Sequence, residues 1–191
     1  REAMEWSLPK AIELSETGGP LIHFAETHDN NRLAANGAVY ALMRVQLSAL
    51  LSHNGAFGIA NGVEWLATEK IDVHGASALN WGSSVNLVEP ISRLNRLLSC
   101  HPAFGPGARM RMIQTGGGNV LAVARQTEQS NPLLVLVNLE CGSRQRVHWH
   151  TDPPQSPQCQ NAWPPERLLA PVPPNPTASV VYRSPTAEFQ N

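Results

Sequence analysis

The sequence predicts a mixed fold, with a parallel β/α part over residues 1–106 and a small antiparallel β domain over residues 107–191. Before residue 102, short apolar runs alternate with helix-length amphipathic stretches, which is typical of β/α architecture. After residue 107, short β-like runs follow one another with turn residues between them. Ten of the 16 prolines lie after residue 150, so we expect loops and extended backbone there.

The first part begins with a strand and a helix. The apolar run Leu21–Ala25 predicts a buried strand, although His23 interrupts it. Apolar residues then recur at spacings of three and four over residues 39–51, which predicts an amphipathic helix. We expect Asn30 or Asn31 to cap this helix, because asparagine is a preferred N-cap residue.

A second strand and helix follow. The apolar run Ala56–Ala60 lies between turn residues and predicts a second strand, and a long irregular segment follows over residues 64–87. The apolar positions between 91 and 98 predict a second helix, which ends before His101 and the proline after it. Two such units cannot close a barrel by themselves.

The second part contains five strand-like runs. The third run is the most apolar, so we expect it to be the central strand, and Gly116–Asn119 predicts a turn between the first two runs. The five runs occupy residues 110–114, 120–125, 133–139, 146–149 and 179–182.

Composition excludes several classes of protein. The 191 residues include 14 basic and 15 acidic ones, and a net charge of −1 argues against binding that depends on neutralising phosphates of nucleic acid. No apolar run reaches the ~20 residues of a membrane-spanning helix. Three widely spaced cysteines do not form a disulfide framework, so we expect a cytoplasmic protein. Because the sequence opens on Arg1, we expect it to be part of a longer chain.

Polar and ionisable side chains gather where the first predicted strand ends. His28 and Asp29 follow the run Leu21–Ala25 directly, and active sites of β/α folds are built on the loops after strands. A turn at the strand end can aim both side chains at one pocket. The alternative is that Asp29 caps the helix and His28 is an ordinary surface residue.

This segment resembles the strand of α-amylase-family glycoside hydrolases that ends in Asn-His-Asp, often with an arginine three residues later. Here Thr27 replaces the asparagine, while His28, Asp29 and Arg32 match. The run from Gly55 to Glu64 resembles the family's eighth strand, although the usual proline and tyrosine are replaced.

Two further segments follow in the family's order. Arg93–Arg96 together with His101–Phe104 is similar to the last barrel helix and the Pro-Ala pair that ends it. The run Leu133–Leu139 resembles the central strand of the family's C-terminal β domain. The resemblance covers residues 20–140 and implies the last quarter of a (β/α)8 TIM barrel followed by a small antiparallel β-sandwich.

The resemblance also implies roles for individual residues. Asp29 matches the carboxylate that stabilises the transition state by holding sugar hydroxyls, and His28 matches the neighbouring hydroxyl-binding histidine. Arg32 is assigned to substrate binding, and we expect it to brace the strand ends more than it touches the reacting bond. Glu64 matches a position of structural support.

A retaining glycosidase also needs a nucleophile and an acid/base, with carboxyl groups ~5–5.5 Å apart. The family carries them on earlier strands, and only 27 residues precede His28, so we expect both groups to come from a missing N-terminal barrel segment, in cis or in trans. Nothing in the sequence places Glu26 opposite Glu64 as a substitute pair. The implied activity is retaining hydrolysis or transfer of α-1,4-glucan bonds, without a cofactor or metal, and we expect these residues alone to be inactive.

Other interpretations remain open. The chain is alternatively a non-catalytic carbohydrate-binding or partner-docking module. Trp65 and Trp81 flank the irregular segment and either stack on glucosyl rings or pack beneath the loop, and we assign Trp65 to substrate binding. His148 and His150 share one face of a predicted strand, a spacing that some metal sites use, but we favour the interpretation that they are exposed edge residues before a proline-rich loop.

Overall fold

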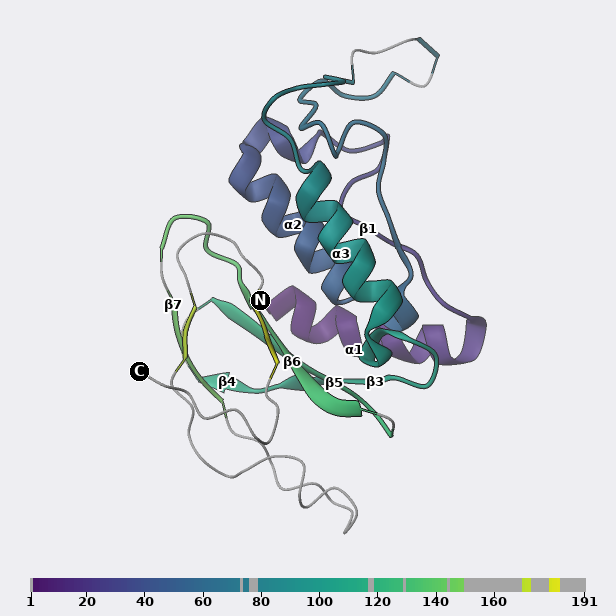
Figure 1. The fold of residues 1–191 in the computed structure, drawn as a ribbon, viewed down its shortest axis with the longest axis vertical. Coiled ribbons are helices and arrows are strands. Elements are labelled where there is room, and N and C mark those ends of the chain that lie inside the picture. The colour runs from purple at the N-terminus through teal and green to yellow at the C-terminus, as the bar shows by residue number, and fades with distance from the viewer. Residues whose placement is uncertain are drawn as a thin grey trace.

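The computed structural model describes residues 2–72, 74–75, 79–116, 119–128, 130–143, 145–149, 170–172 and 179–182. Three helices lie on one side of a four-stranded sheet (Figure 1). They are α1 (Glu2–Gly18), α2 (Ala38–Leu50) and α3 (Val88–Cys100). Short 3₁₀ turns are η1 (Leu33–Asn36), η2 (His53–Gly55) and η3 (Pro102–Phe104).

The strands form three small sheets. The first pairs β1 (His23–Phe24) with β2 (Phe57–Gly58) in parallel, with α2 between them in the chain. The second has the order β3-β5-β6-β9 and the third β4-β7-β8, and all their pairings are antiparallel. These strands are β3 (Arg109–Ile113), β4 (Thr115–Gly116), β5 (Val120–Thr127), β6 (Ser130–Asn138), β7 (Gln145–Trp149), β8 (Ala170–Val172) and β9 (Ser179–Tyr182).

The predicted strand–helix–strand order agrees with the parallel pairing of β1 and β2 around α2. The predicted buried strand over Leu21–Ala25 is wrong, because β1 has only two residues, and Ile22 and Phe24 are 63% and 47% exposed. The irregular segment and the second helix also lie where the sequence predicts them, and the most apolar run forms β6, an inner strand. Within residues 107–116 and 119–128 the predicted antiparallel pairing is present as β3 with β5. Two parallel strands are too few to test a barrel, and the barrel and the sandwich stay predictions.

The predicted helix cap is wrong. Helix α2 begins at Ala38, after the η1 turn, and Gly37 precedes it with φ +102° and no side-chain cap. The N-terminal amide of η1, on Leu33, instead donates to Oε2 of Glu26 at 2.6 Å. A carboxylate seven residues upstream thus caps η1, whereas α2, for which the sequence predicts a cap at Asn30 or Asn31, has no side-chain cap.

Helix α1 has no counterpart in the prediction. It carries Pro9 in its interior, where the proline removes one backbone donor, and its apolar stripe is weak. Leu8 is nevertheless 3% exposed, so the helix is held by packing against the rest of the molecule. Among the helices of the described residues, none has the length and apolar character that crossing a membrane requires.

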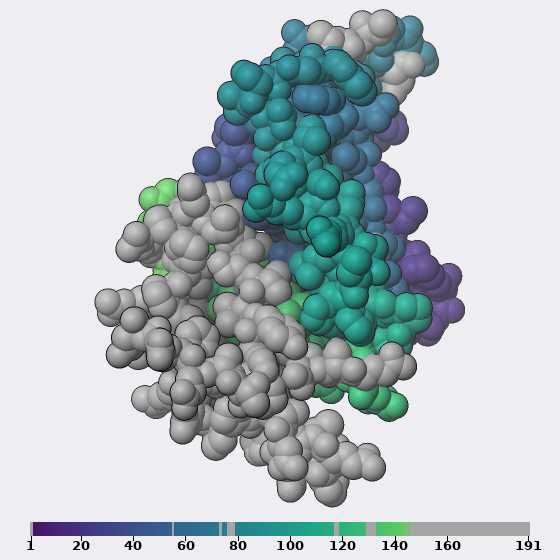
Figure 2. All heavy atoms as spheres, viewed as in Figure 1, coloured from purple at the N-terminus to yellow at the C-terminus, as the bar shows by residue number. Residues whose placement is uncertain are grey.

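One hydrophobic core joins the helices to the sheet. It contains buried residues of α2 and α3, such as Val45 and Leu94, and buried residues of β5 and β6, such as Val123 and Val135. The boundary that the sequence predicts near residue 106 therefore runs through a shared core. In Figure 2 the atoms of residues 80–105, in teal, lie directly against the green atoms of the sheet.

Arg125 lies at the centre of this shared core. Its side chain is 1% exposed, and its Nε donates to the carbonyl oxygen of Ala103 at 2.9 Å. Its Nη1 donates to the carbonyl oxygens of Leu50 at 3.1 Å and Ser52 at 2.8 Å, and its guanidinium lies 4.2 Å from the ring centroid of Phe104. Burial lowers the pKa of Arg125 to about 10.

The positive charge of Arg125 contributes to the lowered pKa of three histidines. Burial, followed by the positive charge of Arg125, lowers the pKa of His53 and of His101, whereas Glu16 raises that of His53. The pKa of His23 is lowered by burial first, then by His53 and by Arg125. The Nδ1 atom of His101 also accepts a hydrogen bond from the amide of Ala103, which requires the unprotonated nitrogen.

Replacing Arg125 with methionine is expected to destabilise the protein by about 3 kcal/mol, because three buried carbonyl oxygens lose their donor. Urea unfolding followed by circular dichroism measures the change. The matched control is Arg109→Met, which removes an exposed arginine from the neighbouring strand β3. Equal losses of stability in the two variants would contradict the role assigned to Arg125.

The free energy of unfolding is expected to decline as the pH falls below about 6.5. The unfolded histidines take up protons near their ordinary pKa of 6.5, whereas the folded ones do so only at lower pH, so the unfolded state binds more protons in this window. Unfolding curves between pH 5 and 8 measure the slope. His53→Gln should flatten it, and a slope that is unchanged in this variant would contradict the assignment.

Candidate functional site

The candidate site is formed by the loops that follow β1 and β2. Because the two strands are parallel, the chain leaves both at the same edge of the sheet. Arg32, from the first loop, ties the loops together: its Nη2 donates to the carbonyl oxygen of Asn61 at 2.8 Å and its Nε to that of Ala67 at 3.3 Å. The sequence-predicted residues His28, Asp29, Glu64 and Trp65 all lie on these two loops.

A buried ion pair supports the first loop. Arg32 Nη1 lies 2.9 Å from Oε1 of Glu26, and the two side chains are 1% and 3% exposed. Glu26 also accepts the amide hydrogen of Leu33 through Oε2. Arg32 is therefore enclosed by protein groups and braces the loops. Its assignment to substrate binding is wrong for this structure, because its side chain is 1% exposed and its donors are used by the protein.

The second loop is shaped around Arg32. Gly62 has φ +90°, and a Cβ atom there would collide with Nη2 of Arg32, so both the conformation and the space require glycine. The amide of Gly62 donates to Oε2 of Glu64 at 2.9 Å. Glu64 thus folds back on its own loop, in agreement with the structural support predicted for it.

His28 and Asp29 lie on the first loop and are open to solvent. Their side chains are 58% and 79% exposed, and His28 Nε2 lies 3.4 Å from Oδ1 of Asp29. Thr27 Oγ1 donates to Oδ1 of Asn30 at 2.9 Å, which closes the turn that carries the pair. The first amide of η1 donates to Glu26 and α2 has no side-chain cap, so the alternative role of Asp29 as a helix cap is wrong.

An aromatic pair lies on the second loop. The ring centroids of Trp65 and Trp81 are 5.3 Å apart, with an interplanar angle of 41°. Trp81 is 77% exposed, while the indole nitrogen of Trp65 is buried. Asn80 holds the two ends of the segment together by donating from Nδ2 to the carbonyl oxygen of Trp65 at 2.7 Å. Trp65 packs under Trp81, and Trp81 presents its ring to solvent.

The arrangement offers hydrogen-bond acceptors and an aromatic face. A carboxylate and an imidazole at the surface can bind hydroxyl groups, and an exposed indole can stack on an apolar ring face. Sequence reasoning missed the structural role of Glu26. The signal available was a glutamate at the end of an apolar strand with an arginine six residues later, two charges that a buried strand end requires to be paired.

Metal binding finds no support in the described part of the chain, where no group of three histidine, cysteine, aspartate or glutamate side chains is placed to hold an ion. His148 belongs to β7 by its backbone, but its side chain and the whole of His150 lie outside the described residues. The proposed metal pair therefore stays a prediction.

Comparison with known proteins gives no assignment. The sequence matches no protein-family model and no curated protein. Function must therefore be argued from the residues of the site.

Glu26→Gln is expected to destabilise the protein by about 3–5 kcal/mol, because it leaves the Arg32 charge buried without its counterion. Chemical denaturation measures the loss, and hydrogen exchange of residues 61–67 should rise with it, since Arg32 anchors that loop. Glu69→Gln, on an exposed glutamate of the same loop region, is the control. If both variants unfold at the same denaturant concentration, the ion pair has no bracing role.

Proposed function

We propose that this chain is the C-terminal part of an α-amylase-family enzyme that hydrolyses or transfers α-1,4-glucan bonds with a retaining mechanism. The observation that carries the proposal is the exposed pair of His28 and Asp29 on the loop after β1, a loop that Arg32 joins to the loop after β2. Loops after strands carry the reactive groups of β/α enzymes, and a rigid base holds such groups at a fixed angle to the substrate.

Asp29 binds the hydroxyl groups of the glucose unit whose bond is cleaved. As that ring approaches an oxocarbenium-like state, a charge-assisted hydrogen bond to its hydroxyl strengthens, which stabilises the transition state more than the bound substrate. His28, 3.4 Å from Asp29, binds a neighbouring hydroxyl. Trp65 places the exposed ring of Trp81 where a further glucosyl unit can stack on it.

The nucleophile and the acid/base come from an N-terminal barrel segment outside these 191 residues, in cis or in trans. The state of the two glutamates supports this division: Glu26 is paired with Arg32, and Glu64 accepts the amide hydrogen of Gly62. Both carboxylates are committed to holding the loops, so they do not form the pair, ~5–5.5 Å apart, that a retaining reaction needs. Neither a cofactor nor a metal enters the mechanism.

The proposed location is the cytoplasm. Cys100 and Cys141 carry free thiols, which suits a reducing compartment. The substrate there is a glycogen-like or maltodextrin α-glucan.

The second candidate is a carbohydrate-binding module without catalysis. Trp81 favours it, because a large aromatic ring exposed to 77% above a second indole is a ready platform for a sugar ring. In this case the affinity depends on Trp81 and needs no further protein segment.

The purified chain is expected to release no reducing sugar from maltodextrin and to bind maltohexaose through Asp29. Asp29→Asn should weaken this binding roughly tenfold, because a charged hydrogen bond is lost. Titration calorimetry or chemical-shift perturbation measures the affinity, and Glu128→Gln, at an exposed site after β5, is the control. Cleavage by the chain alone, or affinities that do not differ among the variants, would contradict the proposal.

The coding DNA upstream of Arg1 separates the two candidates. An in-frame stretch that encodes further β/α units, with an aspartate and a glutamate at the ends of two successive strands, supports the enzyme. An upstream reading frame shorter than one β/α unit, about 30 residues, overturns the cis arrangement. Activity restored by adding a separate barrel segment then supports the trans arrangement, and its failure leaves the binding module.

A further inference from the structure

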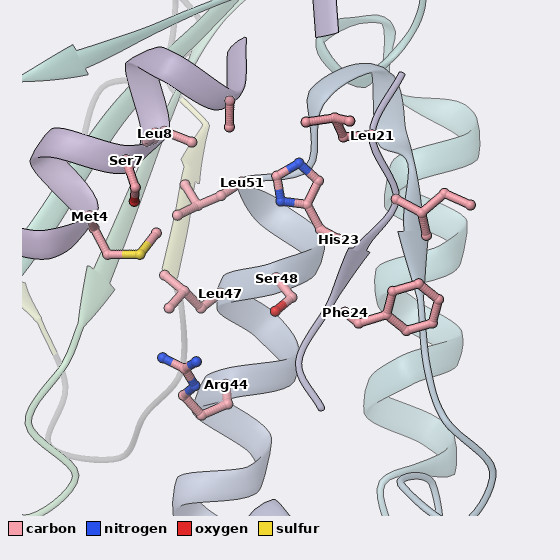
Figure 3. A pocket seen from close by; sticks show the side chains of 12 residues that line it. Met4, Ser7, Leu8, Leu21, His23, Phe24, Arg44, Leu47, Ser48 and Leu51 are labelled. Carbon is pink, nitrogen blue, oxygen red and sulfur yellow. The ribbon is translucent and has the colours of Figure 1, made fainter. Parts of the chain in front are cut away.

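A cavity of about 370 Å³ lies between α1, the segment that contains β1, and α2 (Figure 3). This volume is within the range of small-molecule sites. None of the residues that line it belongs to residues 26–33 or 61–67, which carry the proposed sugar site. The cavity is therefore a separate feature of the fold.

Eight of the 12 lining residues are apolar, and the other four are Ser7, His23, Arg44 and Ser48. Met4 and Leu8 of α1 lie on one side of it, and Leu47 of α2 and Leu51, the residue that follows α2, lie on the other (Figure 3). Such a surface attracts an aliphatic group, because burying it releases water from both partners.

Arg44 supplies the charge of the cavity. It lies four residues before Ser48 on α2, so both side chains are on the same face of that helix. In Figure 3 the guanidinium points from α2 toward Met4 of α1. None of the 12 lining residues is acidic, so no lining carboxylate neutralises Arg44.

The Nε atom of Arg44 is buried and has no hydrogen-bond partner among the described residues. Leaving a buried donor unpaired is costly, and an acceptor from a ligand would remove that cost. The guanidinium is a planar fork that matches the two oxygens of a carboxylate.

We propose that this cavity binds a monocarboxylic acid with a short aliphatic chain. The carboxylate pairs with Arg44 and accepts a hydrogen bond from Ser48, and the aliphatic chain lies between Met4 and Leu47. The binding is non-covalent and does not depend on the proposed glucan activity.

Octanoate is the probe, and 1-octanol and acetate are the comparison ligands, because each lacks one of the two features that the cavity recognises. Titration calorimetry on the 191-residue chain should show that octanoate binds roughly tenfold or more tightly than either. Equal affinity for octanoate and octanol, or no binding of octanoate at all, would overturn the proposal.

Arg44→Met should remove the preference for octanoate over octanol, while Arg96→Met, at an exposed position of α3, should keep it. If Arg44→Met does not fold, Ser48→Leu, which fills the cavity and leaves Arg44 in place, should reduce octanoate affinity by a similar factor. Unchanged octanoate affinity in the folded variants would refute the site. Maltohexaose binding is measured on the same samples and should not change, so failure here is distinguishable from failure of the proposed function.

Discussion

The guanidinium of Arg125 is the contact on which the association of the helices and the sheet depends. It extends from β5 into the region where the end of α2 and the η3 turn meet, and it satisfies three carbonyl oxygens that the end of one helix and the following turns leave without partners. A charge buried this deeply is stable only because those oxygens and the ring of Phe104 replace its water. The position of α2, and with it the strands β1 and β2 on either side of it in the chain, follows from this contact.

The candidate site repeats the same principle on a smaller scale. Arg32 is buried and joins two loops, whereas Asp29, three residues before it, is open to solvent. Arg32 and Glu26 form a buried ion pair, and Gly62 leaves room for the guanidinium, so these three residues hold the loops and are not available to a ligand.

Periodicity and apolar runs predicted α2, α3, β5 and β6 close to their observed bounds, because each of these elements packs one face or both faces in the core. The same reasoning missed α1, whose pattern is interrupted by Pro9, and it misplaced the helix cap, because the capping carboxylate of Glu26 is distant in sequence. At the site, the positions of His28 and Asp29 after the strand were predictable. The pairing of Arg32 with Glu26 was not, since it depends on a tertiary contact that no local spacing encodes.

The common core of α2, β5 and β6 limits how this protein can be altered by recombination. If the sheet were fused to another protein, Val123 and Val135 would lose the helical residues that they pack against. Arg125 would then face solvent or the backbone of the new partner. A hybrid gene joined near residue 106 would therefore have to carry the ends of α2 and η3 along with the sheet. The boundary near residue 106 that the amino-acid pattern suggests cuts through a shared hydrophobic core.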